Sequence, residues 1–151
     1  METMDSSVSE RQAHRLLQVG VFLFLAALFI GLAVPRFAVP RLGLSAHLLA
    51  LMQGLFLIGT GLLWNRLALS FAILRAAFWL ALYGSFAPLT ANLLAAIWGA
   101  GNTLLPIAAG QAHGNALQEQ IITVLLRTGG ASMIAAAILM LWGLRISGRR
   151  G

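Results

Sequence analysis

Few side chains in this sequence could do chemistry, since most of its 151 residues are apolar. Arg127 is the clearest, because it interrupts a long apolar run and an ionisable group in hydrocarbon is costly. It lies about 10 Å inside that run at 1.5 Å per residue. Glu119, at the start of the same run, is the only carboxylate after residue 10. It is therefore the expected counter-ion of Arg127, although a structural ion pair or an arginine extending to the membrane surface explains both residues without chemistry.

A second group of polar residues surrounds the start of an earlier apolar run. Ser45 and His47 stand there, and imidazole exchanges protons near neutral pH, while a serine at this position can simply cap a helix. Gln53 lies further along, where an amide inside a bilayer commonly hydrogen-bonds to another helix. Arg41 precedes the run, and Asn102 lies in a later glycine-rich stretch.

Cofactor and metal motifs are absent from the sequence. There is no P-loop, GxGxxG, GxSxG or HExxH pattern. The lack of cysteine excludes disulfides, iron–sulfur clusters and thiolate zinc sites. Three histidines and four carboxylates are too scattered for an obvious metal motif, so no cofactor and no metal site is predicted. A metal shared by His47 and Glu119 without such a motif stays open.

The composition predicts that membrane helices position these residues. Sixty per cent of the chain is hydrophobic and 9% charged, whereas a soluble domain carries about a quarter charged residues. Four apolar runs each reach the roughly 20 residues that a helix needs to span a bilayer. We therefore expect an all-α integral membrane four-transmembrane-helix bundle, a single membrane domain over residues 1–151. Its helices are expected at about 14–34, 43–65, 72–98 and 119–146, with a Gly-rich loop over 99–118.

The arginines predict the orientation, since cytoplasmic connectors are enriched in basic residues. The side opposite the termini carries only Arg36 and Arg41. Seven arginines share the side of the two termini: Arg11, Arg15, Arg66, Arg75, Arg145, Arg149 and Arg150. Both termini are thus expected in the cytoplasm, and most of the polar candidates gather in the outer half of the membrane.

Two spacing patterns concern how the helices pack. His47, Gly54 and Gly61 repeat every seven residues and share a helix face, where glycine lets another backbone approach. A second stripe could form one wall of a pocket for a flat ring, or could simply be core. It consists of Arg75, Trp79, Tyr83 and Phe86.

The motifs at the polar positions resemble the hydroxylaminobenzene mutase family. The resemblance covers nearly the whole chain and is carried by PRLGLSAH at 40–47 with Gly54, Gly61 and Trp64, by QVG at 18–20, WGAGN at 98–102, PIAAG at 106–110, and QE at 118–119. It implies an isomerase that converts hydroxylaminobenzene-type aryl hydroxylamines to 2-aminophenols by a Bamberger-like rearrangement. It also implies the bacterial inner membrane, nitroarene degradation and no organic cofactor.

For the implied reaction, proton transfer and charge stabilisation are the tasks to assign. His47 and Glu119 are the expected catalytic residues, His47 for proton transfer and Glu119 for stabilising positive charge or acting as the acid. The residues expected to bind the substrate are Arg41, Ser45, Gln53, Asn102 and Arg127. Four helices in so short a chain enclose little volume, so we expect a homo-oligomer in the lipid bilayer.

Two other classes of function remain open from the sequence. Small multidrug exporters are also four-helix chains, but they carry a carboxylate in the first helix, where this chain has only Gln18. A structural subunit without chemistry would not need the polar candidates. Nucleic acid is not an expected partner, because the arginines do not cluster into a basic face.

Overall fold

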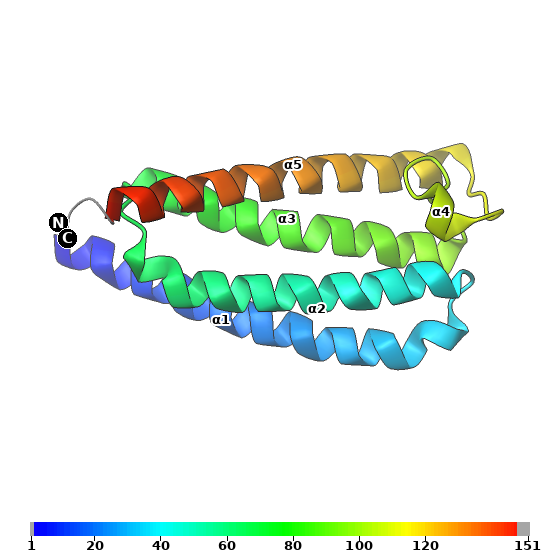
Figure 1. Cartoon of the computed structure of the whole chain (residues 1–151), viewed down its shortest axis with the longest axis horizontal. Helices are drawn as coiled ribbons and strands as arrows, with labels where there is room; N and C mark the ends of the chain where they lie inside the picture. The colour runs from blue at the N-terminus through cyan, green and yellow to red at the C-terminus, as the bar shows by residue number, and fades with distance from the viewer. Residues whose placement is uncertain (1, 148–151) are drawn as a thin grey trace.

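The computed structural model describes residues 2–147, which form helices and short connections (Figure 1). The elements are α1 (Glu2–Ala33), η1 (Val34–Arg36), α2 (Pro40–Leu63), η2 (Trp64–Arg66), α3 (Phe71–Trp98), α4 (Pro106–Ala109) and α5 (Ala116–Ser147). Four segments are long and apolar enough to cross a membrane: Val8–Arg36, Pro40–Arg66, Phe71–Trp98 and Ala116–Arg145. The predicted all-α, four-span fold is confirmed, and the chain is a multi-pass membrane protein.

Several elements differ from those expected. α1 already begins at Glu2, so the polar N-terminal residues continue the first membrane helix. α2 begins at Pro40, because the fixed φ of proline suits the first turn of a helix, where its missing N–H is not needed. Ser45 therefore lies inside α2 rather than capping it. The loop between α3 and α5 contains the short helix α4.

The four long helices form two antiparallel hairpins that lie side by side (Figure 1). α1 packs along α2, α3 packs along α5, and α2 and α3 join the two hairpins in the middle. Both termini lie at one end of the molecule, and the loop with α4 lies at the other. Of the seven arginines assigned to the terminal side, Arg149 and Arg150 lie outside the described residues.

Glycines set the close contacts within each hairpin. A methyl group on Gly54 would lie 2.8 Å from the Gly20 carbonyl oxygen, and one on Gly61 would lie 3.0 Å from the Ala13 carbonyl oxygen. The predicted face of α2 thus packs directly on the α1 backbone. In the second hairpin, the ring of Pro88 packs against Gly129, which has no side chain to obstruct it. α3 continues as one helix through this proline.

The outer faces of the helices are apolar and exposed, as expected for contact with lipid. Large apolar side chains on α1 are more than half exposed, among them Phe22, Phe29 and Leu32. The buried residues are mainly small, which lets the helices approach closely. The fold therefore has a thin interior, and functional groups must lie in grooves between helices or in the loop.

Candidate functional site

His47 lies on the face of α2 that packs against α1. Its ring Nδ1 is 2.7 Å from the carbonyl oxygen of Ala27. A carbonyl oxygen only accepts hydrogen bonds, so Nδ1 must carry the proton and donate it. In the neutral ring, Nε2 then has the free lone pair and can accept a proton. Gly31 makes room for the ring, since a methyl group there would lie 2.8 Å from Nδ1.

A groove of about 460 Å³ opens beside this histidine at the end of the α1–α2 hairpin. It is apolar except for the imidazole, and it is lined by Leu28, Gly31, Leu32, Val34, Pro35, Leu44 and His47. Small-molecule sites typically measure roughly 300–1,000 Å³ and combine apolar walls with few polar groups. The groove therefore has the size and chemistry to hold one small aromatic molecule that enters from the bilayer.

A second polar group joins α2 to α3 in the interior. The hydroxyl of the fully buried Ser85 donates to Gln53 Oε1 at 3.1 Å. Asn92 follows two helical turns later on the same face of α3 and is only 4% exposed. Its Nδ2 donates to the Pro88 carbonyl oxygen at 3.0 Å, whereas its Oδ1 has no hydrogen-bond partner among the described residues. A buried acceptor left in this state is unfavourable by about 1–3 kcal/mol.

Ser85 and Asn92 were missed by the sequence reasoning. Their seven-residue spacing in an otherwise apolar helix was the available signal, since it places both on one face. That face is turned to Gln53, so the amide of Gln53 has the interhelical partner expected of such a residue.

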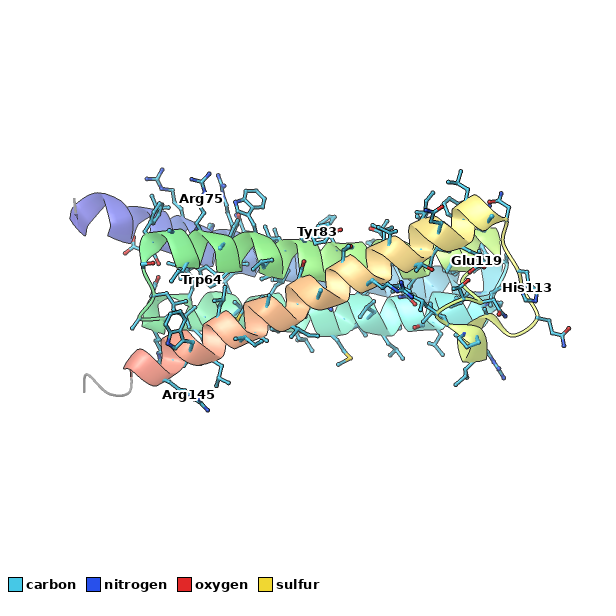
Figure 2. All side chains as sticks on the ribbon, turned by 90° about the horizontal axis from the view of Figure 1, so that it is seen from above. Trp64, Arg75, Tyr83, His113, Glu119 and Arg145 are labelled. Atoms are coloured by element: carbon cyan, nitrogen blue, oxygen red, sulfur yellow. The ribbon has the colours of Figure 1, made fainter. Side chains whose placement is uncertain are left out.

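Glu119 lies beside the glycine-rich loop (Figure 2), whose backbone N–H groups hold its carboxylate. Its Oε1 accepts from Gly101 at 2.7 Å and from Asn102 and Gly114 at 3.2 Å each. Its Oε2 accepts from Thr103 at 3.1 Å. A carboxylate offers about four acceptor positions, so these donors occupy most of them. The arrangement stabilises the ionised carboxylate and joins both ends of the loop to the start of α5.

The expected ion pair between Glu119 and Arg127 does not form. Arg127 lies eight residues further along α5, about 12 Å at 1.5 Å per residue, and its side chain is exposed. The backbone donors of the loop replace the arginine as partners of the carboxylate.

The structure places most of the predicted residues in the half of the molecule that carries the α4 loop, with Gln53 near the middle of α2, but on different sides of the helices. Asn102 and Glu119 meet in the loop, where the Asn102 side chain also donates to the Gly110 carbonyl oxygen at 2.9 Å. His47 faces α1 instead. Leu42, which belongs to the same buried cluster as Ala100 of the loop, lies about 140° around α2 from His47 at 100° per residue.

Two further predicted residues lie near the start of α2. Arg41 is exposed in its first turn, and Ser45 is half-buried one turn later. Within one chain, His47 therefore has its own groove, apart from the cluster of Asn102 and Glu119.

Another groove, between the two hairpins, has no group that transfers protons. It measures about 410 Å³, lies between α2 and α5 toward the terminal end, and has apolar walls apart from Thr60. The Thr60 hydroxyl already donates to Met140 Sδ at 3.7 Å. Of the two grooves, only the one with His47 offers a group that transfers protons.

No set of three or more metal-binding side chains comes together in the part of the chain that the structure describes. Nε2 of His47 could supply one nitrogen ligand to a group that brings its other ligands with it. Glu119 does not share such a site with His47, because its carboxylate is bonded within the loop.

The sequence relationships agree with a membrane isomerase. Residues 12–145 match the family model of styrene oxide isomerase (SOI), and the chain belongs to this family. It is similar to hydroxylaminobenzene mutase HabB of Ectopseudomonas oleovorans, at 47% identity over 133 residues, 88% of this chain and 81% of the relative. It is also similar to hydroxylaminobenzene mutase HabA of the same organism, at 44% identity over 125 residues, 83% of this chain and 93% of the relative. No solved structure matches the chain.

These relationships confirm the resemblance inferred from the sequence motifs. The chain is an enzyme of isomerase type, as predicted, rather than an exporter or a structural subunit.

Proposed function

We propose that this enzyme converts aryl hydroxylamines of the hydroxylaminobenzene type to 2-aminophenols. The observation that carries the proposal is the imidazole of His47, which forms the one polar wall of an apolar groove and has its Nδ1 proton engaged by Ala27. The names of the two mutase relatives supply the substrate class. A small arene dissolved in the bilayer can reach the groove directly.

The rearrangement needs one proton to be delivered and one to be removed. A protonated Nε2 of His47 would donate to the hydroxyl oxygen as the N–O bond breaks, leaving a cation delocalised over nitrogen and ring. The released water adds at the ortho carbon, and the ortho carbon and the added water each lose a proton. Nε2 takes one of these protons back and the nitrogen takes the other, so substrate and product are isomers and the enzyme returns to its initial state.

The remaining polar residues are proposed to orient the substrate or to hold the site in shape. Gln53, its hydrogen-bonded partner Ser85 and the buried Asn92 offer hydrogen-bonding groups inside the bundle. Glu119 and Asn102 fix the loop at the same end of the molecule. Arg41, Ser45 and Arg127 are still predicted to bind the substrate, and two of them, Arg41 and Arg127, are exposed enough to act on a neighbouring copy.

We further propose that the active form is a homo-oligomer in the bacterial inner membrane, with both termini in the cytoplasm. The groove beside His47 is open on one side, so a second copy would complete its wall and exclude lipid. The orientation rests on the arginine distribution.

The direct test supplies purified protein with hydroxylaminobenzene alone and measures products by chromatography. We expect an ortho-aminophenol to form without added cofactor or reductant, and its molecular mass should equal that of the substrate. Loss of the substrate without this product would contradict the proposal. Proton-dependent movement of the unchanged hydroxylamine across sealed vesicles, with no product, would instead identify an exporter.

A further inference from the structure

A basic cleft at the terminal end of the molecule has no role in the reaction above. It lies between the first turns of α1 and the start of α3 and measures about 300 Å³. Its lining consists of Val8, Arg11, Gln12, Arg15, Phe71, Arg75, Phe78 and Trp79. We propose that this cleft binds the phosphate group of an anionic phospholipid.

The charge of the cleft favours an anionic ligand. Two arginines come from α1 and one, Arg75, from α3, and no carboxylate belongs to the lining among the described residues. Arg11 and Arg15 also line an adjoining groove together with Glu10, His14 and Gln18, so this carboxylate lies next to the cleft but outside its lining. Orientation in the membrane requires arginines on this side, but not their convergence from two helices on one cleft. Guanidinium groups bind phosphate oxygens in pairs of parallel hydrogen bonds, so such a convergence suits a phosphate.

Aromatic packing makes the floor of the cleft rigid. Gln12 is buried and accepts a hydrogen bond from Trp64 Nε1 at 3.3 Å. Trp64 meets Phe78 edge-on at 6.2 Å between ring centres, and Phe78 meets Trp79 at 5.4 Å. These contacts fix the floor from which the arginines project. Figure 2 shows Arg75 projecting from α3 at the end that also holds Trp64.

The surface beside the cleft fits the lipid that would carry the phosphate. Trp79 is 57% exposed and lies one turn from Arg75 toward the middle of the membrane. Tyr83 and Phe86 continue this exposed aromatic stripe along α3. A phosphate held by arginines at the membrane surface, with acyl chains along an apolar stripe below it, matches the way in which basic pockets between membrane helices bind anionic lipids. A free phosphate shares the charge but would not use the stripe.

Native mass spectrometry of the full chain tests the proposal. The protein, in non-ionic detergent, is offered equal amounts of phosphatidylglycerol and phosphatidylcholine, and retained lipids are counted. We expect phosphatidylglycerol to be retained preferentially, and the Arg15→Gln/Arg75→Gln variant to lower this preference about tenfold. The matched control Arg36→Gln/Arg145→Gln removes the same charge from outside the cleft and should retain the lipid as the parent does.

Three results would overturn the proposal. The first is equal loss of phosphatidylglycerol in the cleft variant and in the control, which would indicate general charge attraction. The second is full retention in the cleft variant when its melting temperature equals that of the parent. The third is displacement of the lipid by millimolar inorganic phosphate that binds the cleft as tightly as the lipid does, which would make the cleft a site for free phosphate. Should the double variant fail to fold, Arg15→Gln and Arg75→Gln are measured singly, and each is expected to give part of the loss.

Discussion

At His47, one hydrogen bond decides which ring nitrogen can react. Because Nδ1 donates to the Ala27 carbonyl oxygen, the proton that moves during a reaction must be carried by Nε2. The same contact fixes the plane of the ring, so a ligand in the adjoining groove meets a base of defined orientation.

Removing this imidazole should abolish most of the isomerisation while leaving the fold intact. For His47→Ala we expect turnover of hydroxylaminobenzene to fall by about 10²- to 10⁴-fold, the usual contribution of a general acid or base. The matched control is His113→Ala, which removes an exposed imidazole in the loop. Turnover is followed by formation of 2-aminophenol in membranes. Equal activity of the two variants would remove His47 from the mechanism.

Glu119 can be tested for a structural against a chemical role with two substitutions. Glu119→Ala leaves four backbone donors of the loop without their acceptor and should destabilise the protein by about 1–3 kcal/mol. Glu119→Gln keeps one acceptor oxygen but turns an amide toward the N–H that its second oxygen had bonded, so a smaller loss is expected. The measurement is the melting temperature, with the exposed Gln120→Ala as control.

Turnover measured on the same samples separates the two roles. A structural role predicts that activity follows stability, with the alanine variant the worse of the two. A Glu119→Gln variant that melts like the parent yet has lost turnover would show that the carboxylate itself acts in the reaction.

At the scale of elements, the α1–α2 hairpin depends on glycine at particular positions. In Gly54→Ala the new methyl group would lie 2.8 Å from the Gly20 carbonyl oxygen and 2.9 Å from the Phe24 backbone nitrogen. Neither atom can move without shifting α1, so we expect a destabilisation of roughly 1–3 kcal/mol. Gly59→Ala is the control on the same helix, because nothing lies within 4 Å of its added methyl group. It should melt at or above the parent temperature, since alanine favours helix over glycine.

How far the sequence could predict these elements depends on their periodicity. The seven-residue spacing of His47, Gly54 and Gly61 was enough to place all three on one face of α2, and that face does pack on a neighbouring backbone. The spacing could not say which helix supplies that backbone, since every long helix here offers small residues. The four spans could be predicted from a different signal, because each is a long apolar run.

The loop and the interior polar contacts were harder to predict. Residues 99–115 have no periodic pattern, so nothing in the sequence showed that Glu119 would bond to the backbone of Gly101 and Gly114 rather than to an arginine. The contact between Ser85 and Gln53 depends on how two helices rotate against each other. Such rotations follow from packing over the whole length of the helices, which single residues do not reveal.

At the scale of the whole molecule, the groove at His47 predicts where copies should meet. A homo-oligomer that completes this groove brings residues at its rim close to another copy. The chain has no cysteine, so one introduced cysteine reports on one position. Leu32→Cys, at the rim and 75% exposed, should form a disulfide-linked dimer in oxidised membranes.

The control for this experiment lies on another helix. Ile138→Cys is 61% exposed on α5, away from the groove, and should stay monomeric on a denaturing gel. Cross-linking at both positions, or at position 138 alone, would contradict a contact through the groove.

The division into two hairpins also bears on how the chain is made. α1 and α2 find their tightest contacts in each other, so the first pair can complete its packing while α3 is still inside the ribosome. The second pair then docks mainly through contacts of α3 with α2. The backbone N–H of Ala68, in the connection between the pairs, also donates a hydrogen bond to the Gly143 carbonyl oxygen of α5 at 3.2 Å. The connection at residues 67–70 therefore separates two helical pairs that can each pack on their own. A polypeptide cut there would leave two fragments that each still contain a complete helical pair.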